Sequence, residues 1–393
     1  MSADASIFNF DQIIPRTHTS SEKWDGRLAK FGRADVTPLW VADMDFAVPP
    51  AVQGALLARA QHPIYGYTLA DDSVYDSLIA WLYQQHGWHV NREWIVLTPG
   101  IVPAMYAAVQ ALTLPQQGVI VQPPVYPPFF SAVTTHHRTL LENPLVLENG
   151  RYRMDLAQLE QCARQGAKLL LLCTPHNPVG RVWQCDELDA VLDIARRYQL
   201  TIFADEIHAD LIYPEFRHTP LATLASVDDA IITAVAPSKT FNLAGLGLSA
   251  LIIPDAAIRR SMVNMFAQLH IQSLNPFSLT AFTAAYQHGG AWRDALMVYV
   301  CDTRDAVIAY LAQYIPAIRP IKSEGTYLMW LDCRELGMND AQLQDFFVQK
   351  CGLGMSTGIS FGQGGSGFMR LNLASPRALV MAALARVAAQ LNM

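Results

Sequence analysis

The chain has 393 residues, of which 51% are hydrophobic and 16% charged, enough for two domains with large apolar cores. Its formal net charge is -6 at pH 7 and no block of basic residues stands out, so nucleic acid is excluded as its main partner. A polar N-terminus, the absence of an apolar run near ~18 residues, and six cysteines without Cys-x-x-Cys pairs predict a cytoplasmic protein with no membrane segment, disulfide framework or metal site.

The first part of the chain is expected to be irregular and then helical. Residues 1–50 are rich in turn-forming prolines and contain the string PLWVADMDF at 38–46. Two prolines precede a predicted helix at 51–59, and an amphipathic helix is predicted at 73–86. Tyr65 lies in the loop between these two helices.

From Trp94 the pattern changes to short apolar strands that alternate with helices. The expected helices cover residues 101–112, 156–164 and 187–198, and the expected strands 94–98, 119–122, 168–173, 201–204, 230–235 and 248–253. Apolar strands separated by helices are typical of an α/β fold, in which a mostly parallel sheet lies between helices.

The last part of the chain predicts a smaller α+β domain. The chain is largely helical after Pro254, and further elements are expected in the order helix 291–314, strand 326–331, helix 340–349, strand 368–373 and helix 376–391. We therefore divide the chain into an N-terminal segment that packs with the small domain (1–50), a large domain (51–290) and the small C-terminal domain (291–393).

Chemically capable residues follow several of the predicted strands. These residues are Gly100, Tyr126, Asn177, Asp205 and Lys239. Ligands of open parallel sheets bind beyond the carboxyl ends of the strands, so we expect these residues to share one site. A partly desolvated lysine loses its proton and becomes a nucleophile toward an aldehyde, although a lysine in a solvated turn is the simpler interpretation.

If the lysine holds an aromatic aldehyde such as pyridoxal phosphate (PLP), its neighbours acquire distinct roles. Asp205 could keep a pyridinium nitrogen protonated, or could merely cap a helix. Asn177 could bind the ring hydroxyl oxygen, although Asn-Pro is also a turn signal. Tyr126 could stack on the ring or be an ordinary packed tyrosine, and His208 could approach the ring edge or be structural.

The anionic groups of cofactor and substrate also need partners. Gly100, Ile101 and Val102 at a strand-to-helix turn could donate backbone hydrogen bonds to a phosphate, with the Ser238 hydroxyl beside them. Arg370 stands between apolar residues in a predicted strand. It could bind a substrate carboxylate through two hydrogen bonds, and a structural ion pair is the competing interpretation.

The order of these residues resembles that of fold-type I PLP enzymes in the class I/II aminotransferase superfamily. Within it, several strings resemble the MalY/PatB-type carbon–sulfur β-lyases: 40–46 (WVADMDF), 65–67 (YGY), 175–183 (PHNPVGRVW), 205–208 (DEIH) and 238–245 (SKTFNLAG). Later strings of the same kind are GTYL at 325–328 and GFMRLN at 367–372. His208 and Gly247 depart from the superfamily, which commonly has a tyrosine and a phosphate-binding arginine at these positions.

The resemblance implies a homodimer with active sites at the subunit interface. It implies Lys239 as the Schiff-base lysine and general base. Tyr65 would reach the cofactor phosphate of the neighbouring subunit. Val41 and Ala42 would line the substrate pocket together with Tyr126 and Arg370, which would bind the α-carboxylate of an amino-acid substrate.

The implied activity is α,β-elimination from L-cystathionine or a related cysteine S-conjugate, which gives a thiol, pyruvate and ammonia. An aminotransferase is the alternative, because the same deprotonated substrate can instead pass on its amino group. A non-catalytic regulatory or binding protein on the same fold is a third possibility. The set Lys239, Asp205, Asn177 and Arg370 would have no chemical role in such a protein.

Overall fold

The structure is a computed structural model that describes residues 8–271 and 274–391. A seven-stranded sheet with the strand order β2-β10-β9-β8-β7-β3-β4 forms its centre. Only β10 is antiparallel to its neighbours, which confirms the predicted mostly parallel sheet. The strands are β2 (Ile95–Thr98), β3 (Gly118–Val121), β4 (Thr139–Glu142), β7 (Ala167–Cys173), β8 (Thr201–Asp205), β9 (Ile231–Val235) and β10 (Ser249–Ile252).

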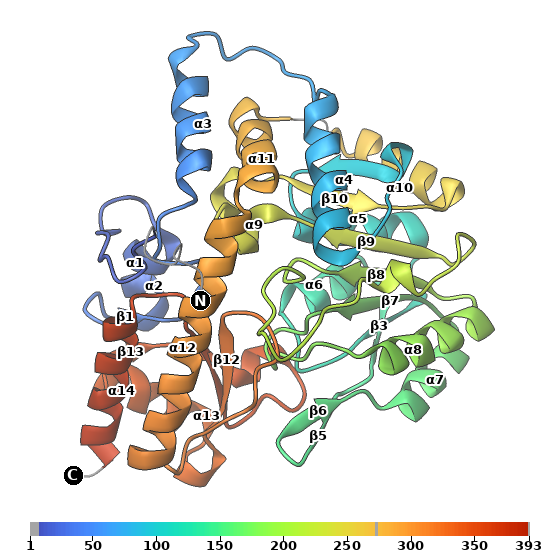
Figure 1. The fold of residues 1–393 in the computed structure, drawn as a ribbon. Coiled ribbons are helices and arrows are strands. Elements are labelled where there is room, and N and C mark those ends of the chain that lie inside the picture. The colour runs from blue at the N-terminus through green and yellow to red at the C-terminus, as the bar shows by residue number, and fades with distance from the viewer. Residues whose placement is uncertain (1–7, 272–273, 392–393) are drawn as a thin grey trace.

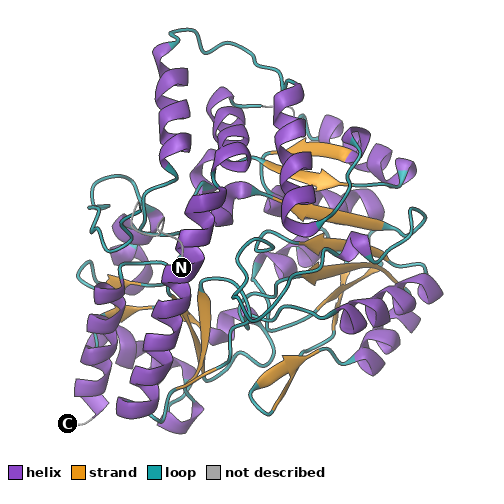
Figure 2. Ribbon diagram, in the orientation of Figure 1, coloured by secondary structure: helices purple, strands orange, loops and turns teal. Residues whose placement is uncertain are grey.

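Helices cover both faces of this sheet (Figure 2). Because side chains of a strand alternate between its faces, Leu170 and Leu172 of β7 pack in one core and Leu169 and Leu171 in another. The first core is closed by α7 (Leu156–Arg164) and α8 (Cys185–Tyr198). The second is closed by α5 (Ile101–Leu112), α6 (Pro128–Thr134) and α10 (Ala256–Gln268).

A third core joins the large sheet to the rest of the chain. It contains Ala250 and Ile252 of β10 and residues of α4 (Asp72–His86), α11 (Pro276–His288) and α12 (Gly290–Tyr314). The helix α3 (Pro50–Gln61) packs on α11, and the connection from α3 to α4 projects from the body at the top of Figure 1.

A smaller antiparallel sheet lies beside α12 and α14 (Figure 1). Its strand order is β11-β12-β15-β14. The expected strand 326–331 starts two residues late, because Thr326 has φ +68°, which a strand cannot accommodate. The elements are β11 (Arg319–Pro320), β12 (Leu328–Asp332), α13 (Asp340–Asp345), a π-helix (Phe346–Lys350), β14 (Ser356–Thr357), β15 (Phe368–Asn372) and α14 (Arg377–Leu391).

The N-terminal segment contacts this smaller sheet region. Its strand β1 (Thr37–Pro38) pairs in parallel with β13 (Leu353–Gly354), and the Asp45 amide donates to the Ala374 carbonyl at 2.9 Å. The limits 1–50, 51–290 and 291–393 themselves stay predictions. The remaining elements are α1 (Glu22–Asp25), α2 (Arg27–Phe31), β5 (Val146–Glu148), β6 (Arg151–Arg153), α9 (Pro237–Thr240) and the 3-10 helices Arg92–Trp94, Leu221–Thr223, Ala244–Leu246, Arg334–Leu336 and Gly358–Phe361.

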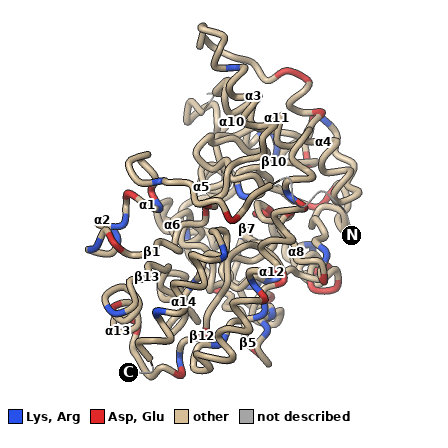
Figure 3. The backbone as a smooth tube through the Cα atoms, turned by 60° about the vertical axis from the view of Figure 1, so that its left-hand side comes forward, with Lys and Arg blue, Asp and Glu red and all other residues tan. Residues whose placement is uncertain are grey.

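Charges of both signs are interspersed along the chain (Figure 3). Within the described ranges, every helix is too short or too polar to cross a membrane. The same residues contain no group of three or more His, Cys, Asp or Glu side chains placed to hold a metal ion.

Candidate active site

The loops that follow β2, β3, β7, β8 and β9 enclose a cavity of about 310 Å³. The carboxyl ends of parallel strands lie at one edge of the sheet, which is why residues far apart in sequence meet there. The expected residues that line this cavity are Ala42, Gly100, Ile101, Val102, Tyr126, Asn177, Asp205, His208, Ser238 and Lys239.

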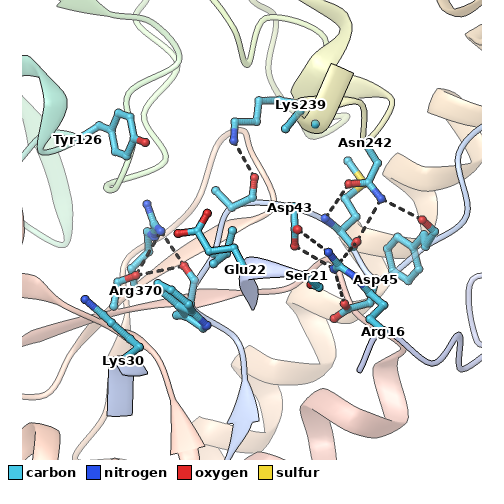
Figure 4. Close-up of a pocket in the computed structure, with 18 of the residues that line it drawn as sticks. Arg16, Ser21, Glu22, Lys30, Asp43, Asp45, Tyr126, Lys239, Asn242 and Arg370 are labelled. Carbon is cyan, nitrogen blue, oxygen red and sulfur yellow. Dashed lines mark hydrogen bonds and ion pairs between the residues drawn. The ribbon is translucent and has the colours of Figure 1, made fainter. Parts of the chain in front are cut away.

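A wider cavity of about 980 Å³ adjoins the first and shares Ala42, Tyr126 and Lys239 with it. Its walls include Val41 and Arg370, so the structure brings the predicted substrate-binding residues to this second space (Figure 4). The residues expected at a cofactor and those expected at a substrate thus lie in two connected cavities, with Lys239 at the junction.

Lys239 lies in α9, directly after the buried strand β9. The side chain borders the cavities but lies deep in the molecule, and its Nζ donates to the Ala42 carbonyl at 2.7 Å. Burial and the nearby Arg370 guanidinium lower the pKa of Lys239 to about 8. A much larger fraction of this amine is therefore neutral near pH 7 than for an ordinary lysine.

Asp205 ends β8 and is 8% exposed. Its carboxylate accepts one hydrogen bond, from the Ile207 amide at 3.2 Å, and among the described residues no cation lies within ion-pair distance. Burial raises the pKa of Asp205 to about 6, and the Ile207 amide offsets only part of that effect. A buried carboxylate with so few donors fits a ligand that brings its own N–H, such as a protonated pyridine ring.

His208 and Asn177 lie on the same cavity wall. His208 is 2% exposed, and its Nδ1 has no hydrogen-bond partner among the described residues. Burial, with Lys239 and Arg370 nearby, lowers the pKa of His208 to about 3, so the ring is neutral. The side-chain oxygen of Asn177, in the wall of the smaller cavity, accepts a hydrogen bond at 3.1 Å from Nη1 of Arg370, in the wall of the wider cavity.

The smaller cavity also has an anion-binding end. Gly100 is the N-cap residue of α5, a helix of 12 residues, and the first-turn amides of Ile101 and Val102 have no acceptor within the helix. The third residue, Pro103, has no amide hydrogen. Ser238 lines the same cavity. Free amides at a helix N-terminus beside a hydroxyl fit a phosphate group.

Arg370 is buried in β15 without an acidic partner. Its Nη2 donates to the Trp40 carbonyl at 2.8 Å and to Ser356 Oγ at 3.2 Å, whereas its Nε has no partner. Within residues 8–271 and 274–391 no carboxylate lies within 4 Å of this guanidinium, so the alternative of a structural ion pair does not describe it. Burial lowers the pKa of Arg370 to about 10, which leaves it charged near neutral pH.

Three residues to which the sequence assigned no role hold the segment 41–46. Asn372 Nδ2 donates to the carbonyls of Val41 and Asp43, each at 2.7 Å. Asn242 Nδ2 donates to the carbonyls of Met44 and Phe46, and Tyr327 OH donates to the Ala42 carbonyl at 2.9 Å. The only sequence signal was their place in the strings SKTFNLAG, GFMRLN and GTYL.

Tyr65 is the one predicted site residue that lines neither cavity of its own chain. It is 55% exposed in the connection between α3 and α4, where its hydroxyl donates to the Ala60 carbonyl at 2.7 Å. Its ring lies 5.7 Å from that of Phe277.

Fold and site together define a class of protein, an α/β enzyme whose lysine follows a sheet strand and faces a buried aspartate. Residues 34–387 match the family model "Aminotransferase class I and II", and the chain belongs to this family. It is 40% identical over 386 residues to the cystathionine β-lyase PatB of Bacillus subtilis, covering 98% of this chain and 100% of that protein. It is 31% identical to the protein MalY of Escherichia coli, covering 94% and 95%.

A solved structure agrees with this assignment. Cystalysin from Treponema denticola, which contains a pyridoxal 5'-phosphate cofactor, superposes with a TM-score of 0.95 at 35% identity, covering 98% of this chain and 99% of that chain. The fold-type I architecture expected from the sequence is therefore confirmed.

Proposed function

We propose that this protein is a PLP-dependent carbon–sulfur β-lyase. It cleaves L-cystathionine or a related cysteine S-conjugate into a thiol, pyruvate and ammonia. The observation that carries this proposal is the junction of the two cavities, where Lys239, with its lowered pKa, lies between the buried Asp205 and the unpaired Arg370. Relatives named as cystathionine β-lyases support elimination as the outcome.

The cofactor fits the smaller cavity. When bound, PLP supplies an electron sink for the pair released at the substrate Cα. We assign Asp205 to the ring nitrogen and Asn177 to the ring hydroxyl oxygen, with His208 at the ring edge. Tyr126 would cover the ring face. The amides of Gly100, Ile101 and Val102, with Ser238 Oγ, would bind the phosphate.

Lys239 is the residue that moves the proton. With cofactor and substrate bound, Lys239 Nζ would remove the substrate Cα proton as general base. Arg370 binds the substrate α-carboxylate next to the walls formed by Val41 and Ala42. This contact fixes Cα relative to Nζ, and Tyr126 borders the same space.

Elimination then breaks the bond between Cβ and sulfur, and the electron pair of that bond leaves with the thiolate. The thiolate takes up a proton, and the remaining carbon skeleton reacts with water to give pyruvate and ammonium. The overall balance is one thioether amino acid and one water converted into one thiol, one pyruvate and one ammonium, with no net oxidation.

The test is incubation of the holoenzyme with L-cystathionine in the absence of a keto acid. Pyruvate and homocysteine are expected in equal amounts, and Lys239→Ala should abolish their formation. No pyruvate, but a new amino acid once a keto acid is added, would assign the protein to the aminotransferases instead.

The active enzyme is proposed to be a cytoplasmic homodimer. The connection between α3 and α4 carries exposed apolar side chains, namely Ile64 (67%), Tyr65 (55%), Tyr67 (111%) and Leu69 (87%). Exposed apolar side chains of this kind are common at contacts between protein chains, which supports the dimer. We place Tyr65 at the cofactor phosphate of the neighbouring subunit. The six cysteines are all free, as is typical of cytoplasmic proteins.

A further inference from the structure

Most charged groups around the wider cavity already have partners. Arg16 forms ion pairs with Asp43 at 2.6 Å and Asp45 at 2.7 Å. Arg370 donates to Asn177, Trp40 and Ser356, and Lys239 donates to the Ala42 carbonyl. The charged side chains Arg16, Arg370 and Lys239 therefore all have polar partners.

Two charged side chains in the cavity wall, Glu22 of α1 and Lys30 of α2, lack such partners. Within the described part of the chain, neither forms an ion pair within 4 Å or a side-chain hydrogen bond. Both are exposed, and Lys30 Nζ lies 5.6 Å from the centre of the Trp40 ring. The two free charges have opposite signs.

The Glu22 and Lys30 side chains lie close to the residues proposed to carry out the reaction. In Figure 4 the Glu22 carboxylate points into the space between Lys239 and Arg370, and Lys30 lies on the Arg370 side of that space. The negative charge of Glu22 also acts to raise the pKa of Lys239, although burial and Arg370 outweigh it. Glu22 is therefore electrostatically coupled to the site of proton transfer without touching it.

We propose that Glu22 and Lys30 form a distal subsite that recognises a zwitterionic leaving group. This inference rests on the proposed lyase function. With the substrate α-carboxylate at Arg370 and the cofactor in the smaller cavity, the leaving group extends into the wider cavity, past the Glu22 carboxylate and toward Lys30. There Glu22 binds an ammonium group and Lys30 a carboxylate. The substrate class is thus thioethers between cysteine and a second amino acid or aminothiol.

The expected effect of Glu22 and Lys30 on substrate selectivity is small because both side chains are exposed. Water screens exposed ion pairs, so this subsite contributes to selectivity more than to rate. A change of up to about fivefold in the ratio of two kcat/KM values is expected when one charge is removed.

The test compares S-(2-aminoethyl)-L-cysteine with S-propyl-L-cysteine, which has the same number of heavy atoms but no ammonium group. Pyruvate release gives kcat/KM for each. The wild-type enzyme should prefer the aminoethyl compound, and Glu22→Gln should lower this preference by up to about fivefold. Glu22→Lys should reverse it, whereas Glu93→Gln, at an exposed glutamate outside both cavities, should leave it unchanged. Lys30→Met should lower the preference for S-carboxymethyl-L-cysteine over S-propyl-L-cysteine in the same way.

The outcomes separate the two proposals. Pyruvate from every substrate, with a preference that neither Glu22 variant changes, would overturn the distal subsite and leave the lyase intact. No pyruvate from any substrate would overturn the proposed function itself.

Discussion

The Lys239 ammonium and the Ala42 carbonyl, 197 positions apart in the chain, share a hydrogen bond of 2.7 Å. The same carbonyl accepts from Tyr327 OH at 2.9 Å. One backbone oxygen of residue 42 therefore connects α9 with Tyr327, the residue just before β12. Among the described residues, this oxygen is the hydrogen-bond acceptor of the Lys239 amine.

Removing the Tyr327 hydroxyl should loosen this arrangement. Tyr327→Phe deletes a buried hydrogen bond to the Ala42 carbonyl, which costs about 0.5–1.5 kcal/mol, so kcat/KM should fall about two- to tenfold. The matched control is Tyr213→Phe, because the buried Tyr213 hydroxyl has no hydrogen-bond partner in the part of the chain that the structure describes. That variant should keep its activity and its melting temperature. Equal losses in both variants would show that the Ala42 contact has no special role.

Asp45 should be essential for stability. It accepts from Lys23 Nζ at 2.8 Å and Ser375 Oγ at 2.6 Å, and Lys23 is fully buried. Burial opposes ionisation of Asp45, but the Lys23 ammonium and the hydrogen bonds from Lys23, Ser375 and Trp24 together outweigh it, so the pKa of Asp45 is lowered. Asp45→Asn removes the nearer counter-ion of that buried ammonium and leaves only Asp43, at 3.7 Å, so it should cost up to about 3–5 kcal/mol in denaturant unfolding.

The lowered pKa of Asp45 also predicts how the stability difference between wild type and Asp45→Asn depends on pH. The stability from Asp45 is present above its ordinary pKa of about 3.9 and is lost as pH falls through the lower folded value, so the variant and wild type should converge only below about pH 4. Asp35→Asn, at an exposed carboxylate paired with Arg33 at 2.7 Å, is the control and should change little. A wild-type-like Asp45→Asn would contradict the prediction.

How far the sequence predicts this site depends on the kind of contact. Strand ends are predictable, because apolar runs and helix periodicity mark them, so Asp205 and Lys239 were found and do line one cavity. The hydrogen bonds from Lys239 and Tyr327 to the Ala42 carbonyl were not predictable, because every residue has a backbone carbonyl and the sequence does not mark which one accepts. Glu22 and Lys30 were missed because exposed charges on short helices resemble any solvated turn.

The Tyr65 assignment yields a complementation test. Tyr65→Ala should weaken PLP binding, because its hydroxyl would leave the Ala60 carbonyl to bind the partner's phosphate. Lys239→Ala subunits mixed with Tyr65→Ala subunits should recover activity, since one site of the mixed dimer then has both residues intact. Tyr83→Ala, at another exposed tyrosine, serves as the control in place of Tyr65→Ala and should bind PLP normally. Failure to recover activity despite subunit exchange would remove Tyr65 from the neighbouring site.

We expect the Asp205 carboxylate to serve the reaction and to lower the stability of the cofactor-free protein. Burial raises its pKa from an ordinary value near 3.9 to about 6, so in the cofactor-free protein its ionised form destabilises the fold. The stability associated with the protonated carboxyl is complete below the ordinary pKa and is lost as pH rises through about 6. Asp205→Asn should therefore raise the stability of the cofactor-free protein by roughly 1–3 kcal/mol at about pH 8, and by much less at about pH 4.

The control for this effect is the neighbouring buried carboxylate Asp210, which has the opposite shift. Burial opposes its ionisation, but His86 at 3.3 Å and Trp81 at 3.0 Å stabilise the anion, and the pKa of Asp210 is lowered. Asp210→Asn should therefore destabilise the protein near neutral pH, where Asp205→Asn stabilises it. In the holoenzyme, Asp205→Asn should lower kcat by at least about a hundredfold, because the ring nitrogen loses its counter-charge. If the melting temperatures of cofactor-free Asp205→Asn and Asp210→Asn changed in the same direction, the buried Asp205 carboxylate would not be destabilising. The proposal that it binds a cationic ligand would then lose its support.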